Sequence, residues 1–233
     1  MTGSSYRTAL IVGVGAGLSA SLARTFAKAG MTVALAARRP DDLAALAKET
    51  GGKAFACDAT KLAEVEKLFA DVEAAVGSPD VVVYNASFRT RGPFVELDPA
   101  DVERSLAVTA FGGFLVAQQA AKRMLANHHG AIFLTGASAS VKGYAQSAPF
   151  AMGKFALRGM AQSMARELSP QGIHVAHVVI DGGIRSARRV DPPGKPDSLL
   201  DPDAIARSYL HLLEQDRSAW AWEIELRPWV ESF

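Results

Sequence analysis

A doubly wound α/β domain is the fold class that the sequence predicts. Apolar stretches of strand character alternate with helix-period stretches along the chain, and this alternation is typical of a parallel sheet with helices on both faces. The run Val81–Tyr84 is apolar throughout, which suits a central strand buried on both sides. With 233 residues, no internal repeat and no linker, we expect a single domain spanning residues 1–233.

The first half of the chain supplies four of the expected strands. The first strand ends in a glycine-rich turn, and the longest helix here has charged residues on one side and apolar residues on the other. In order, the expected elements are strand Ala9–Val12, helix Leu18–Lys28, strand Thr32–Ala37, helix Asp41–Lys48, strand Lys53–Cys57, helix Leu62–Val76 and strand Val81–Tyr84.

The second half continues the alternation and contains one irregular segment. Asp98 followed by Pro99 predicts a capped helix start, and this helix can run to about Leu125. Residues 185–202 carry four prolines and little periodicity, so we expect a surface loop or lid over the substrate. The remaining elements are strand Ala131–Leu134, helix Pro149–Leu168, strand Ile173–Ile180, helix Ala204–Leu213 and strand Trp222–Leu226.

Composition excludes several classes of function. A net charge of +1 without a basic block gives no electrostatic case for nucleic acid. The single cysteine, Cys57, excludes an internal disulfide, and His174 and His177 would face opposite sides of a strand, so no metal site is expected. The uncharged run Thr8–Ala23 is too short to span a membrane. We expect a soluble, cytoplasmic protein without membrane or nucleic-acid partners.

The glycine-rich turn between the first strand and the first helix predicts a nucleotide site. Gly13, Gly15 and Gly17 remove side chains where the backbone must turn tightly and approach a phosphate. The N–H groups at the start of the following helix, from Leu18, face that phosphate. A flexible turn is the alternative interpretation of three clustered glycines.

These motifs resemble the short-chain dehydrogenase/reductase family over roughly residues 8–226. The family pattern Thr-Gly-x-x-x-Gly-x-Gly falls on Val12, Gly13, Gly17 and Ser19, with Val12 and Ser19 as departures. The resemblance implies a seven-stranded parallel sheet. It further implies cofactor contacts by a set of residues that follow the third, fourth and sixth strands: Asp58 and Ala59, Asn85 and Ala86, and Gly182 and Ile184.

The residues after the second strand predict NADP as the cofactor, with NAD less favoured. NAD-selective sites place a carboxylate there to accept hydrogen bonds from the ribose. This chain has Ala37 followed by Arg38 and Arg39, and guanidinium groups suit a 2′-phosphate. Two solvated arginines at a helix start are the alternative.

The family's catalytic residues are mostly replaced. The resemblance places the family's lysine on Lys154, the proton-donating tyrosine on Phe150 and the serine that binds the oxyanion on Ala137. It places the asparagine on Thr109. Only Lys154 keeps its functional group, through which the family holds the cofactor ribose and lowers the pKa of the tyrosine. Ser138 and Tyr144 are candidate substitutes for the lost hydroxyls.

Two functions remain open at this point. The first is an NADP(H)-dependent oxidoreductase with an atypical centre, acting on a small carbonyl, alcohol or activated double bond of unknown identity. The second is a non-catalytic dinucleotide-binding protein that senses or associates. Small residues on the helix Phe150–Leu168 (Gly153, Ala156, Gly159, Ala161 and Ala165), together with the family's usual pairing, predict a homodimer or homotetramer. Arg185, Arg188, Arg189 and Lys195 form a cationic lid that either attracts an anionic substrate or is simply solvated.

Overall fold

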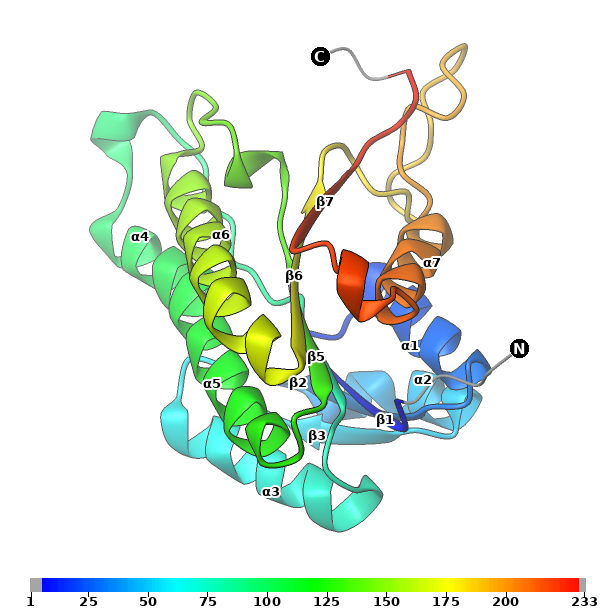
Figure 1. Ribbon diagram of the computed structural model, residues 1–233. Coiled ribbons are helices and arrows are strands. Elements are labelled where there is room, and N and C mark those ends of the chain that lie inside the picture. Colours follow the sequence, from blue (N-terminus) through cyan, green and yellow to red (C-terminus); the bar gives the residue numbers. More distant parts are fainter. Residues whose placement is uncertain (1–5, 231–233) are drawn as a thin grey trace.

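One parallel sheet of seven strands organises the protein, in the order β3-β2-β1-β4-β5-β6-β7 (Figure 1). The computed structural model describes residues 6–230. The strands are β1 (Thr8–Val12), β2 (Thr32–Ala37), β3 (Lys53–Ala56), β4 (Val81–Tyr84), β5 (Gly130–Thr135), β6 (Ile173–Ile180) and β7 (Glu223–Leu226). All neighbouring pairs run parallel. The predicted fold class is therefore confirmed.

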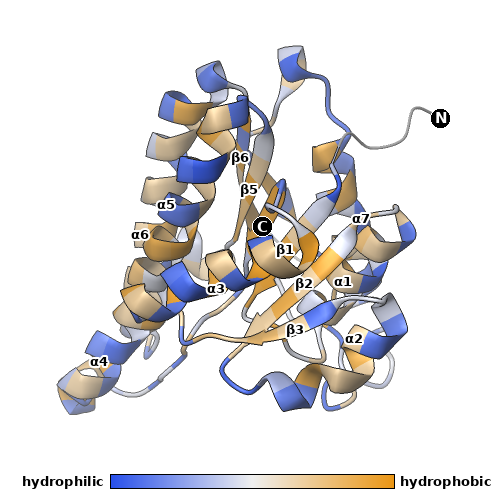
Figure 2. Cartoon of the chain, turned by 90° about the horizontal axis from the view of Figure 1, so that it is seen from below, coloured by the Kyte–Doolittle hydropathy of each residue, from blue (hydrophilic) through white to orange (hydrophobic). Residues whose placement is uncertain are grey.

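Helices cover both faces of this sheet, and the inner strands bury alternate residues against the two layers. In β4, Val81 and Val83 join the core beneath α1 (Leu18–Lys28) and α7 (Pro202–Leu213), and Val82 and Tyr84 join the opposite core. That second layer consists of α3 (Leu62–Val76), α4 (Pro99–Leu106), α5 (Gly112–Met124) and α6 (Ala148–Leu168). Figure 2 shows orange strands between helices whose outer sides carry blue, hydrophilic residues. The continuous apolar strands are explained by burial on both faces.

The long helix expected from Asp98 begins where predicted but is not continuous. An Asp98 carboxylate oxygen accepts a hydrogen bond from the Ala100 N–H at 2.9 Å, which confirms the cap. Residues Ala107–Phe111 then form a π-helical segment between α4 and α5. The buried Tyr84 hydroxyl donates to the Val108 carbonyl, which gives that carbonyl a partner outside the helix. Periodicity alone could not predict this irregular turn, because the partner comes from β4.

Two other segments refine the sequence expectations. The helix predicted at Asp41–Lys48 begins as a 3₁₀ turn, Pro40–Leu43, and continues as α2 (Ala44–Thr50). Residues 185–201 form no helix or strand of their own, and Ile184 bridges to Leu200 at the base of this lid segment. Between residues 6 and 230, no helix has the length and apolar character that a membrane-spanning segment requires.

Candidate functional site

Two contiguous cavities lie at the carboxyl ends of the strands, where ligands bind in open α/β sheets. The first, of about 1060 Å³, is lined by the segments that follow β1, β2, β3 and β4. The second, of about 780 Å³, lies beyond β5 and β6 and is lined by α6 and the lid segment. Asn85, Ser87 and Arg188 line both cavities. A single extended ligand can therefore reach from one cavity into the other.

The glycine-rich turn forms one end of the first cavity. Gly13 has φ +89°, and a Cβ there would lie 2.4 Å from the backbone nitrogen of Ala86, so the two loops meet closely. At Gly15 and Gly17 an added Cβ would meet no protein atom within 4 Å. No side chain caps α1, although the Ala20 and Ser21 N–H groups already donate to the Gly17 carbonyl, so the N–H groups that can face a ligand are those of Leu18 and Ser19. Leu18 has a buried side chain and offers only its backbone.

Ser19 links the glycine-rich turn to the residue after β4. Its hydroxyl donates to the Gly13 carbonyl at 3.0 Å and accepts from the Asn85 side-chain amide at 2.7 Å. The serine is buried, so both hydrogen bonds form away from water. Ser19 departs from the family pattern, which has glycine at this position, and in the structure its hydroxyl has two hydrogen-bond partners.

The arginines after β2 line the first cavity but are not equivalent. Arg39 pairs with Asp42 at 2.9 Å, and both side chains are exposed. Arg38 lines the same cavity and forms no ion pair with any residue in the described part of the chain. Across the cavity, Asp58 and Ala59 follow β3. Although burial opposes it, hydrogen bonds from Thr60 hold the pKa of Asp58 below its usual range.

The second cavity brings Ala137, Phe150 and Lys154 together. Lys154 is buried, and its ammonium donates to the Thr135 carbonyl at 2.6 Å. Burial lowers the pKa of Lys154 to about 8. The Lys154 nitrogen lies 5.8 Å from the centre of the Phe150 ring. The three sequence positions predicted to share a centre thus share one cavity, although two of them carry no polar group.

Thr109, the fourth position, is not among the residues that line either cavity. It is buried in the π-helical segment, where its hydroxyl accepts from the Phe88 N–H at 3.4 Å. A Cβ at Gly153 of α6 would lie 2.9 Å from the Thr109 Cβ. Thr109 therefore packs against α6.

Both candidate substitutes line the second cavity, but in different surroundings. Tyr144 is half exposed. Ser138 lies beside the buried Asp181 carboxylate. Although burial opposes it, the interactions with Ser138 and Lys142 hold the pKa of Asp181 below its usual range. Gly182 and Ile184, which follow Asp181, line the same cavity.

A buried polar network beside this cavity was not predicted. The Ser140 hydroxyl accepts from the Ala137 N–H at 3.1 Å and lies 3.2 Å from His177 Nε2. His177 Nδ1 lies 2.9 Å from Glu223, which Arg158 binds through two nitrogens. Burial lowers the pKa of His177 to about 4, despite the adjacent carboxylate. The neutral ring thus donates from Nδ1 and accepts at Nε2.

No local pattern could have revealed that network, because its members come from four separated segments. A histidine inside an otherwise apolar strand was the only signal. The network connects the segment after β5 with β6, β7 and α6, and through Ser140 it holds the backbone of Ala137. It therefore fixes one wall of the second cavity.

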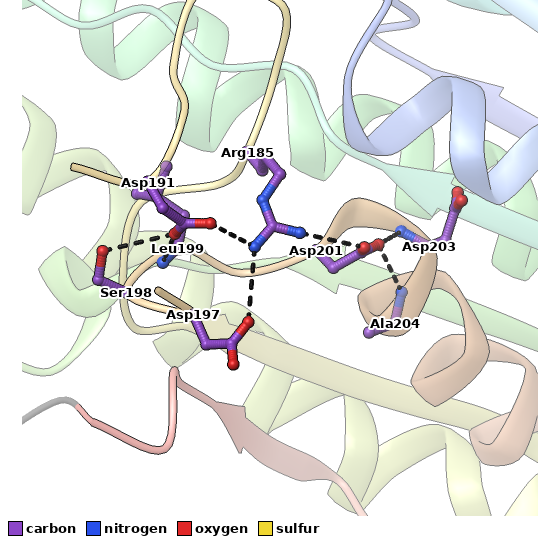
Figure 3. A network of polar contacts seen from close by, with 8 residues as sticks. All are labelled: Arg185, Asp191, Asp197, Ser198, Leu199, Asp201, Asp203 and Ala204. Carbon is purple, nitrogen blue, oxygen red and sulfur yellow. Dashed lines mark hydrogen bonds and ion pairs between the residues drawn. The ribbon is translucent and has the colours of Figure 1, made fainter. Parts of the chain in front are cut away.

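The lid arginines, which the sequence predicts to act as one cationic cluster, fall into two groups in the structure. Arg185 is held inside the lid by Asp191 at 2.6 Å, Asp201 at 3.5 Å and Asp197 at 3.9 Å (Figure 3). Arg188 and Arg189 instead line the second cavity, whereas Lys195 is absent from the lining residues. Arg89 and Arg91, from the segment after β4, complete the cationic lining and were missed because they are distant in sequence.

The small residues of α6 also divide into two faces. Gly153, Ala161 and Ala165 are buried within the subunit, so they do not line an outer face as the assembly prediction assumed. Ala156 and Gly159 are exposed. The exposed large apolar side chains of α5, α6 and the π-helical segment are Phe111, Phe114, Met152 and Phe155.

Comparisons with known proteins agree with this geometry. A sequence model described as short chain dehydrogenase matches residues 7–190. D-threitol dehydrogenase of Mycolicibacterium smegmatis is 30% identical over 174 residues, which cover 72% of this chain and 67% of that protein. A short-chain dehydrogenase structure from Rhodopseudomonas palustris has 35% identity and a TM-score of 0.83, covering 96% of this chain and 99% of that one. A metagenomic short-chain oxidoreductase in complex with NADP has 28% identity and a TM-score of 0.81, covering 95% and 97%.

Proposed function

Because the chain belongs to the short-chain dehydrogenase family, we propose that it is an NADP(H)-dependent oxidoreductase with an atypical catalytic centre. Its substrate would be a small carbonyl compound, alcohol or activated double bond. The observation that carries the proposal is the pair of contiguous cavities, with the open glycine-rich turn at one end and Lys154 at the other.

The residues of the first cavity suit a dinucleotide. The uncapped start of α1 and the open positions Gly15 and Gly17 suit a pyrophosphate, and Asp58 and Ala59 would contact the adenine side. Asn85, Ala86, Gly182 and Ile184 would line the path to the nicotinamide. Arg38, with Arg39 beside it, would bind a 2′-phosphate, and NADP in the 28% identical metagenomic structure supports that choice over NAD.

Lys154 is the residue to which we assign the chemistry. When bound, the nicotinamide supplies or accepts a hydride. Ala137 and Phe150 have no proton to give, so the oxygen of a reduced carbonyl needs another donor. The buried Lys154 ammonium, with a pKa of about 8, can pass a proton to that oxygen and recover one from water. The Thr135 carbonyl keeps the ammonium at the cavity wall.

A second function is favoured by the same two replacements. Phe150 and Ala137 keep the approximate shape of the family's tyrosine and serine while removing each hydroxyl. A cavity retained without its polar groups suits a dinucleotide-binding protein that senses or associates. Both functions require cofactor binding, and only turnover separates them.

The test combines cofactor binding with turnover. Calorimetry should give tighter binding of NADPH than of NADH, and NADPH oxidation should be followed with a panel of aldehydes and ketones. The reduction rate of the wild type should fall as pH rises through about 8, because the protonated Lys154 is then lost. Lys154→Met should abolish turnover. NADPH binding with no turnover on any substrate would favour the sensing function, and failure to bind NADPH would refute both.

A further inference from the structure

Five cations and no carboxylate line the second cavity: Arg89, Arg91, Lys154, Arg188 and Arg189. Arg89 and Arg91 lie in the segment after β4, whereas Arg188 and Arg189 lie in the lid. Two separate segments thus bring guanidinium groups to one cavity. The four arginines are largely exposed, so water screens much of their mutual repulsion, but no carboxylate among the lining residues neutralises them.

Contacts within the protein do not compensate these charges. Among residues 6–230, none of the four arginines forms an ion pair, whereas Arg24, Arg158 and Arg185 each bind a carboxylate at 2.6–2.7 Å. The Arg89 guanidinium lies 5.0 Å from the centre of the Phe150 ring. Partial desolvation of the largely exposed Arg89 lowers its pKa, and the charges of Arg91 and Arg189 lower it further. The three arginines are therefore close enough to interact.

The carboxylates of the lid pair with Arg185 and not with the arginines that line the second cavity. Asp191, Asp197 and Asp201 surround Arg185 (Figure 3). Asp191 also accepts from the Leu199 N–H, and Asp201 caps α7 through the Asp203 and Ala204 N–H groups. Asp181 forms ion pairs with Arg227 and Lys142. The nearby negative charges are thus paired, and the cavity arginines stay free for a ligand.

We infer that the substrate of this site carries an anionic group, a carboxylate or a phosphate, which Arg89, Arg91 and Arg189 bind while its reacting carbon lies toward Lys154. This inference rests on the proposed oxidoreductase function. Arg188 lines both cavities and is left out of the assignment because it can equally face the cofactor. The other three line the second cavity alone, so they cannot be explained by the cofactor phosphates in the first. Guanidinium groups are the side chains best suited to oxyanions.

The experiment uses matched pairs of carbonyl compounds that differ in charge. Dihydroxyacetone phosphate is compared with dihydroxyacetone, and levulinate with its methyl ester, by calorimetry on the NADPH-saturated protein and by NADPH oxidation. The variant Arg89→Gln/Arg91→Gln/Arg189→Gln removes the cluster. The control Lys28→Gln/Lys48→Gln/Arg207→Gln removes the same charge at exposed positions outside both cavities.

We expect the anionic member of at least one pair to bind roughly tenfold to hundredfold more tightly than its neutral partner, and the cluster variant to lose this preference. The control variant should keep it, and NADPH affinity should be unchanged in both. The phosphate and carboxylate pairs show which oxyanion is preferred. Equal binding within both pairs, a preference that survives in the cluster variant, or no binding of either anionic probe would overturn the inference. Binding is measured apart from turnover. A wild type that prefers the anionic compounds in calorimetry but oxidises no NADPH with them would therefore count against the oxidoreductase function alone.

Discussion

Restoring the two hydroxyls at positions 137 and 150 should convert this cavity into a faster carbonyl-reducing centre. The variant Phe150→Tyr/Ala137→Ser places a phenol and a hydroxyl in the cavity that Lys154 lines. The Phe150 ring centre lies 5.8 Å from the Lys154 nitrogen. At a separation of about 5 Å and an effective dielectric constant of about 20, the ammonium would stabilise a phenolate by about 3 kcal/mol. This equals about two pKa units and brings the phenol toward neutral pH.

The expected gain in rate follows from these positions. A placed general acid contributes about 10²–10⁴ and an oxyanion donor about 10²–10³, and the two act as a unit. We therefore expect at least about a 10²-fold faster reduction. The assay is NADPH oxidation on the carbonyl panel. Phe155→Tyr is the matched control, because it adds a phenol to an exposed position of α6 outside the cavity.

Three results would count against this reasoning. A double variant that binds NADPH with wild-type affinity but gains no rate would show that the geometry does not support the family's chemistry. An equal gain in the double variant carrying Lys154→Met would show that the ammonium does not depress the pKa of the phenol. A wild type already as fast as the double variant would show that the unchanged cavity holds an efficient proton donor, and the variants Lys154→Met and Ser138→Ala would identify it.

Four further outcomes follow from the structure. Arg38→Ala should weaken NADPH binding roughly tenfold and leave NADH unchanged, whereas Arg39→Ala should do less because Asp42 already pairs with it; calorimetry measures both. The pKa of His177 is about 4 in the folded protein, below its unfolded value of 6.5. The contribution of the neutral His177 to the free energy of unfolding is therefore present above pH 6.5 and lost as pH falls toward 4. The free energy of unfolding, measured with denaturant, should fall by about 3 kcal/mol between pH 6.5 and pH 4, and His177→Gln should make it depend less on pH. Ser19→Ala should lower the unfolding free energy by about 1–3 kcal/mol and weaken NADPH binding; unchanged values in the same two assays would contradict it. In light scattering, the wild type should have the mass of a dimer or tetramer, and Phe155→Asp should have a mass closer to that of one chain. The substitution places a charge on the exposed apolar face of α6 through which we expect the subunits to pair.

Local patterns in the sequence were sufficient for most elements of the fold. The bounds of α1, β2, α3, β4 and β6 agree with prediction, because apolar periodicity and turn residues are local properties. The π-helical break at Ala107–Phe111 was not predictable, since it involves a hydroxyl from β4 that lies far away along the chain. The two faces of α6 likewise depend on which neighbours pack against it.

For the candidate site, the sequence determined residue chemistry, and the tertiary structure decided which groups meet. The sequence alone showed the glycine-rich turn and the arginines after β2, and the family resemblance predicted that Phe150 and Ala137 stand where relatives have hydroxyl groups. It could not show that Ser19 binds Asn85, that the lid aspartates neutralise Arg185, or that Arg89 and Arg189 share a cavity. Hydrogen bonds act over about 3 Å and electrostatic interactions over about 10 Å, and residues far apart in the chain come within such distances only after it has folded.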